Sequence, residues 1–177
     1  KDFPMSALSD TLRQIRRTLV GKHPYPLEPT EKLLAQVLSR AGYDAAAVVS
    51  DTYFGKARWS SITRGFARVN ESPYRDVRGG KHNSALVTDA AIAELNRPRT
   101  KPLFLWLHYY DAHYPHQQPA KGKRFGSSRA DVYDAELALV DAEVGRFLQE
   151  LRKKLPAAVL VLSADHGIAF DEPRHEK

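Results

Sequence analysis

The residues whose chemistry is most evident are Asp165 and His166. They follow an apolar run, residues 157–162, which predicts a buried parallel strand over 157–163. Open α/β sheets bind ligands at the carboxyl ends of such strands. A carboxylate beside an imidazole suits a divalent metal, with Zn²⁺ or Mn²⁺ favoured and Ca²⁺ or Mg²⁺ as alternatives. The competing interpretation is a turn in which Asp165 caps the next segment and His166 lies on the surface.

A second polar cluster follows another apolar segment, residues 102–107. Within nine residues it contains His108, Asp111, His113 and His116. Imidazoles at a strand end could bind an anionic ester, stabilise charge on the transferring group or protonate a leaving oxygen. His113 is the better placed candidate for catalysis and substrate binding, and His108 is a second candidate for substrate binding. The alternatives are that His108 packs at the strand end and that His116 is an ordinary loop residue.

A third candidate lies near the start of the chain, where Ser9 and Thr11 precede Arg13. A hydroxyl at the beginning of a helix, with arginine beside it, could act as a nucleophile next to an anion-binding group. The competing interpretation is an ordinary N-capped basic helix.

Composition limits the classes of partner. The 177 residues suit one domain, and the net charge of +6 with a pI near 9.5 favours phosphate or sulfate esters, anionic lipid or nucleic acid. No nucleic-acid-binding motif accompanies the charge, so we expect no nucleic-acid partner. The chain has no cysteine, which excludes disulfides and a catalytic thiol. It also has no apolar run long enough for a transmembrane helix.

The predicted elements alternate along the chain. We expect helices over 31–40, 84–96 and 130–154, and strands over 45–50, 102–108 and 157–163. Thr30 is the expected cap of the first helix and Gly42 its stop. Residues 51–83 and 116–129 are expected to be irregular excursions within a single domain over 1–177. This order predicts an α/β fold with a doubly wound, mostly parallel sheet and helices on both faces.

The ordered set of motifs resembles the sulfatase-like branch of the alkaline phosphatase superfamily, which includes sulfatases and phosphoethanolamine or phosphoglycerol transferases. The segments that carry the resemblance are 33–43, 46–50, 101–115, 133–145 and 163–167. The resemblance implies an alkaline-phosphatase-like core, a divalent metal, and attack on a sulfate or phosphate ester that is either free or lipid-linked. By the same resemblance, Asp165 and His166 match a metal-binding pair, and His113 matches a histidine that contacts the transferring group. Glu136 falls in a helix motif that we interpret as structural.

The chain departs from the family pattern in ways that affect the nucleophile. Spacing to Gly21 selects Thr11, whereas a Cys/Ser-x-Pro-x-Arg pattern selects Ser9 with Arg13. The family's opening strand, with its first acidic ligands, has no counterpart here, so we expect an incomplete domain. The family also leads us to expect an extracytoplasmic or membrane-anchored protein, attached through segments outside this chain. The alternative function is a catalytically degenerate member that binds anionic lipid headgroups or a protein partner.

Overall fold

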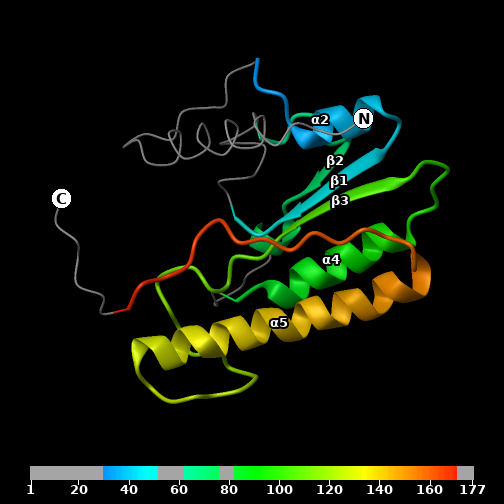
Figure 1. Ribbon diagram of the computed structural model, residues 1–177. Coiled ribbons are helices and arrows are strands. Elements are labelled where there is room, and N and C mark those ends of the chain that lie inside the picture. The colour runs from blue at the N-terminus through cyan, green and yellow to red at the C-terminus, as the bar shows by residue number, and fades with distance from the viewer. Residues whose placement is uncertain (1–29, 52–61, 76–81, 171–177) are drawn as a thin grey trace.

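Three parallel strands form the centre of the computed structural model, which describes residues 30–51, 62–75 and 82–170. The strands are β1 (Asp44–Val49), β2 (Arg68–Asn70) and β3 (Leu103–His108), in the spatial order β2-β1-β3. The helices are α2 (Leu34–Arg40), α3 (Ser72–Arg75), α4 (Ser84–Asn96) and α5 (Arg129–Lys154). Figure 1 shows α2 on one face of the sheet and α4 with α5 on the other. The expected α/β fold with a parallel sheet is confirmed.

β1 is the central strand, and its sequence explains this position. It consists of small or β-branched apolar residues after Asp44, and residues 45–49 are all buried. Such a strand can be covered on both faces, as parallel strands require. It pairs with β3 over its whole length, from Asp44 opposite Leu103 to Val49 opposite His108. The ends of β1 and β3 are therefore level with each other.

β3 divides its side chains between the two faces, as the two-residue period of a strand dictates. Its three leucines pack on the α4–α5 side around Ala91, Leu95 and Phe147. On the opposite face Phe66 stacks with Phe104 and Trp106, at ring-centroid distances of 5.6 Å and 6.0 Å. This second face carries aromatic rings toward the end of the strand, where His108 lies.

The ends of α2 follow local rules. Gly42, at φ 92°, lets the Gly42 and Tyr43 amides donate back to the carbonyls of Ser39 and Leu38, at 3.1 Å and 3.0 Å. This is the Schellman arrangement, and the expected stop at Gly42 is confirmed. The expected start is wrong: α2 begins at Leu34, and the Leu33 amide donates to Oε1 of Gln36 at 3.1 Å. That side chain satisfies the amide that Thr30 was expected to serve.

The strand predicted over 157–163 is wrong. The segment has no strand pairing, and Val159 and Val161 are 93% and 83% exposed. An apolar run becomes a parallel strand only when a neighbouring strand accepts its backbone hydrogen bonds. Among the described residues, β1, β2 and β3 pair only with one another. Figure 1 shows the segment returning as coil from the end of α5 toward the carboxyl ends of the strands.

The excursion expected over 51–83 contains two elements in the part that the structure describes. β2 pairs with β1, with Ala46 opposite Arg68, and α3 follows it directly. Gly65, at φ 94°, brings this segment against α2, where a Cβ would lie 2.3 Å from the Gln36 amide nitrogen. Such short elements carry too little periodicity to be recognised in sequence. No helix of the described residues is both long and apolar enough to cross a membrane.

An ion pair at the amino-terminal end of the sheet yields a first prediction. Arg68 donates to both oxygens of Asp44, at 2.7 Å and 2.8 Å, and this hydrogen bonding holds the pKa of the Asp44 carboxyl below its ordinary value of 3.8. A depressed pKa stabilises the fold above that value and loses its effect as the pH falls below it. Asp44→Asn should therefore cost about 1–3 kcal/mol at pH 7.

The measurement is urea unfolding of the full-length protein at pH 7 and at pH 3. The difference between wild type and Asp44→Asn should shrink at pH 3, because below the ordinary pKa of 3.8 the unfolded-state carboxyl takes up a proton and part of the stabilisation is lost. Asp134→Asn, at an exposed position of α5, is the control and should behave as wild type at both values. A difference of equal size at both values would contradict the assignment.

Candidate active site

The carboxyl ends of β1 and β3 bring the first polar groups together. His108 closes β3 opposite Val49, and the Ser50 hydroxyl donates to the His108 carbonyl at 2.7 Å. Asp51 follows directly and is 6% exposed. This is the edge of a parallel sheet at which ligands bind. The position follows from strand register, because both strands end at the same level.

The His108 imidazole is influenced by three charged or titratable groups at this edge. Burial lowers the pKa of the His108 imidazole, the negative charges of Asp51 and Asp165 raise it, and His113 lowers it. His108 is thus both a packed strand-end histidine and a neighbour of the other three groups. Asp165 reaches this edge although its segment is not a strand. The folded chain therefore gathers Asp51, His108, His113 and Asp165.

His113 is held by its neighbours while its side chain remains exposed. Its ring stacks on Tyr110, with centroids 4.4 Å apart, and Tyr110 in turn lies 5.8 Å from the His108 ring. Nδ1 lies 2.6 Å from the Tyr114 carbonyl oxygen. A carbonyl only accepts, so Nδ1 carries a proton and Nε2 is the nitrogen left for a ligand. The structure thus leaves the His113 ring exposed and supported on one face by Tyr110.

Asp165 and His166 lie on exposed coil, with side chains 79% and 64% exposed. The expectation that they project from a strand end is wrong, because 157–163 forms no strand. The His166 amide donates to Asp165 Oδ1 at 2.9 Å, as the alternative turn interpretation requires. His166 Nδ1 lies 2.8 Å from the Gly167 carbonyl, so Nδ1 donates and Nε2 keeps its lone pair.

The donor atoms of this pair fit one metal ion. Nε2 of His166 and Oδ2 of Asp165 are 3.6 Å apart. Two ligands held about 2.1 Å from a tetrahedral ion lie about 3.4 Å from each other. Within 30–51, 62–75 and 82–170 no three His, Cys, Asp or Glu side chains form a group that could hold a metal. The spacing of these two donor atoms is thus compatible with a shared metal ion, but the described residues bring no third ligand beside them.

The proposed nucleophiles, Ser9 and Thr11, and their neighbour Arg13 lie outside the described residues. Their predicted roles are unchanged by the structure.

Sequence reasoning missed the function of Asp111. This carboxylate is 1% exposed and accepts from the backbone amides of Asn83 and Ser84 at 2.9 Å and 3.0 Å. It also accepts from the Ser84 hydroxyl. These amides begin α4, so Asp111 caps a helix that is distant in sequence. Its sequence signal was a carboxylate between two strand-end histidines, but capping from another segment has no local pattern.

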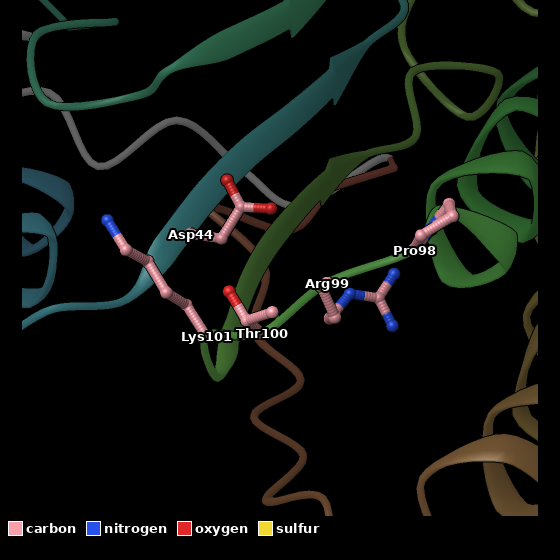
Figure 2. A pocket seen from close by; sticks show the side chains of 5 residues that line it. All are labelled: Asp44, Pro98, Arg99, Thr100 and Lys101. Carbon is pink, nitrogen blue, oxygen red and sulfur yellow. The ribbon is translucent and has the colours of Figure 1, made fainter.

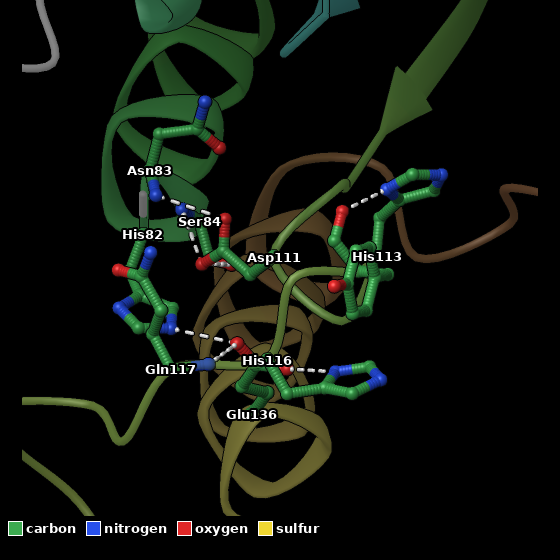
Figure 3. A network of polar contacts seen from close by, with 9 residues as sticks. His82, Asn83, Ser84, Asp111, His113, His116, Gln117 and Glu136 are labelled. Atoms are coloured by element: carbon green, nitrogen blue, oxygen red, sulfur yellow. Dashed lines mark hydrogen bonds and ion pairs between the residues drawn. The ribbon is translucent and has the colours of Figure 1, made fainter. Parts of the chain in front are cut away.

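Glu136, which the sequence placed in a structural helix motif, is fully buried in α5, but its partners were not foreseen. Its Oε1 lies 3.2 Å from His82 Nε2 and accepts from the Gln117 amide at 2.9 Å, while Oε2 lies 2.8 Å from His116 Nδ1 (Figure 3). His116 is therefore an anchored residue rather than an ordinary loop residue. The available signal was a glutamate on the apolar face of a predicted helix, three residues after Tyr133 and four before Val140.

The open cavity of about 400 Å³ shown in Figure 2 lies elsewhere. Its lining residues are Asp44, Pro98, Arg99, Thr100 and Lys101. They begin β1 and precede β3, so the cavity is at the amino-terminal edge of the sheet, opposite His113 and Asp165. Parallel sheets carry their ligand sites at the other edge, where Asp51 and His108 lie.

The fold and this edge place the chain among α/β proteins with a parallel sheet of the alkaline phosphatase type. Residues 7–177 match the sulfatase family, and the chain belongs to that family. It is 34% identical over 96 residues to the uncharacterized sulfatase YdeN of Escherichia coli (strain K12), a match covering 49% of this chain and 17% of YdeN.

A solved structure shares the fold. It is a protein in the alkaline phosphatase superfamily from Vibrio parahaemolyticus, with a TM-score of 0.55 and 18% sequence identity. The match covers 69% of this chain and 32% of that protein. The chain thus corresponds to less than a third of the length of either relative.

Proposed function

We propose that the protein containing this chain is a metal-dependent hydrolase or transferase that acts on a sulfate or phosphate ester through a hydroxyl nucleophile. The observation that carries the proposal is the gathering of Asp51, His108, His113 and Asp165 at the carboxyl ends of β1 and β3. Membership of the sulfatase family supports the class of reaction. We extend the proposal to lipid-linked esters and to an extracytoplasmic or membrane-anchored location.

Asp165 and His166 would hold the divalent metal, with Zn²⁺ or Mn²⁺ favoured by the mixed oxygen and nitrogen donors. When bound, such an ion polarises the ester oxygen and lowers the pKa of a nearby hydroxyl. The protein prepares His166 for this role through its Nδ1 contact with the Gly167 carbonyl, which orients the ring and leaves Nε2 available. The negative charge of Asp165 also raises the pKa of the His108 imidazole.

His113 would contact the transferring sulfuryl or phosphoryl group. Stacking on Tyr110 and the Nδ1 contact to Tyr114 determine the direction of the ring. A contact from Nε2 to an anionic ester oxygen requires a proton on Nε2, so the imidazole acts there as a charged donor. A donor held in place before reaction stabilises developing charge more than a mobile one does. Arg13 and His108 are the other proposed substrate-binding residues.

The test of the proposal is His113→Ala in the full-length protein. We expect kcat to fall by about 10²–10³-fold, as for loss of one oriented donor, while bound metal stays the same. Turnover of nitrophenyl sulfate, nitrophenyl phosphate and a phosphodiester, with elemental analysis, provides the measurement. Lys121→Ala, an exposed change in the same loop, is the control and should keep wild-type turnover.

Full activity in His113→Ala would exclude the proposed role of His113. A metal-free wild type that turns over none of these esters but binds anionic lipid vesicles would instead favour the degenerate binder.

A further inference from the structure

We propose that Glu136 is a positioning residue that holds the loop carrying His113 in its reactive position, an inference that rests on the proposed function. Glu136 contacts His82, His116 and the Gln117 amide. Its effect would pass through the loop of residues 111–117, which lies between β3 and α5.

The far end of the loop is held by buried contacts with Glu136. Glu136 is 0% exposed, and His116 exposes only 5% of its side chain. The carboxylate accepts from the side chain of His116 and from the next backbone amide, that of Gln117. An ionised carboxylate only accepts, so His116, His82 and the Gln117 amide each donate to Glu136. His82, the third donor, ties the same carboxylate to the segment before α4.

The near end of the loop is fixed as well. Asp111 binds the two amides at the start of α4. His113 lies two residues after this anchor and three before His116, and its own amide donates to the Tyr110 carbonyl at 3.0 Å. Figure 3 shows His113 to one side of Asp111, with His116 and Glu136 below. The exposed ring thus belongs to a short segment that is fixed to α4 at one end and to α5 at the other.

Losing the Glu136 carboxylate should be energetically costly, because the groups that donate to it would lose their acceptor. Removing the carboxylate leaves the nearly buried His116 imidazole, the His82 imidazole and the part-buried Gln117 amide without this acceptor, and unsatisfied buried donors are expensive. The loop would move to find water, and His113 would move with it. Displacement of a catalytic group by about 1 Å is enough to cost about 10²-fold in rate. Glu136 therefore affects the chemistry while remaining remote from it.

The closing experiment uses Glu136→Ala, Glu136→Gln and the control Glu150→Ala in the full-length protein. Glu150 lies on the same helix and forms an exposed pair with Lys153. Glu136→Ala should lower kcat by about 10- to 100-fold with little change in KM. Glu136→Gln keeps one acceptor for the Gln117 amide and should lose less than about threefold. Glu150→Ala should match the wild type.

The readout that separates positioning from general damage is the same substitution in the His113→Ala background. If Glu136 acts through His113, Glu136→Ala should cost less than about twofold there, because the effects of coupled residues do not add. An equal loss in both backgrounds would overturn the proposal. If Glu136→Ala does not fold, His116→Phe serves in its place, since it keeps the ring packed against Tyr133 but removes the bond to Oε2.

A structural readout keeps this inference distinct from the proposed function. Hydrogen exchange in peptides covering residues 111–118 should quicken at least about tenfold in Glu136→Ala and stay at the wild-type rate in Glu150→Ala. Unchanged hydrogen exchange in Glu136→Ala would show that Glu136 does not hold this loop, whether or not the protein turns over an ester. Faster exchange with a wild type inert toward every ester would overturn the proposed function and its catalytic consequence, but not the anchor.

Discussion

Full-length protein carrying Thr11→Ala is expected to lose ester turnover by about 10⁴-fold or more, the scale seen when a covalent nucleophile is removed. A serine or threonine hydroxyl is a weak nucleophile and needs a nearby metal or base to become reactive. We favour Thr11 over Ser9 because the longer match, counted back from Gly21, selects it. Ser9→Ala should then keep most of its turnover, and each variant serves as the control for the other.

The residue that carries the transferred group in a trapped intermediate decides between Thr11 and Ser9. Mass spectrometry of an intermediate trapped at low pH should locate the added sulfuryl or phosphoryl group on Thr11. If the added group is found on Ser9, and turnover is lost only in Ser9→Ala, then Ser9 is the nucleophile. Full activity in both variants would show that neither hydroxyl attacks, and the proposed hydroxyl mechanism at this position would be wrong.

The second large effect is expected from Asp165→Ala. The carboxylate is one of the two proposed ligands, and losing one ligand while the imidazole remains should lower metal occupancy by about 10- to 100-fold at limiting metal, as even outer partners of a ligand have effects of this size. Turnover should fall in proportion and recover partly with excess Zn²⁺ or Mn²⁺. Elemental analysis after gel filtration measures occupancy, and the activity titration measures recovery.

Asp89→Ala provides the matched control for this prediction. Asp89 is an exposed carboxylate of α4 whose partner is Arg146, at 2.8 Å. Its removal should leave the metal content unchanged. Metal content in Asp165→Ala equal to that of the wild type would remove Asp165 from the ligand set, and the turn interpretation of this segment would then be preferred.

Much of the fold could be predicted from local pattern. The helix predicted over 84–96 is observed as α4 (Ser84–Asn96), and the helix and strand predicted over 130–154 and 102–108 are observed within one residue as α5 and β3. These elements are long or strongly apolar, so their periodicity is unambiguous. Gly42 ended α2 as expected, because a left-handed residue at that position is a local requirement.

The strand predictions that failed depended on neighbouring strands, and no local pattern specifies which strands pair. The run at 157–162 is as apolar as β1, yet β1 is a strand because β2 and β3 supply its hydrogen bonds on both sides. The short β2 exists for the same reason, although its sequence carries little signal. Strand formation at these two places was thus decided by pairing rather than by composition.

The candidate site divides in the same way. Residue type and position after apolar segments were enough to predict His108, His113, Asp165 and His166 as candidate site residues. The position of Asp51 beside His108 could not be predicted, because it depends on the register between β1 and β3. The influence of Asp165 on His108 depends on the path that the chain takes back from α5. Only the tertiary structure revealed Asp111 and Glu136 as anchors, because each carboxylate meets amides from a segment distant in sequence. Hydrogen bonds across the chain depend on how helices and loops pack, and packing is a property of the whole fold.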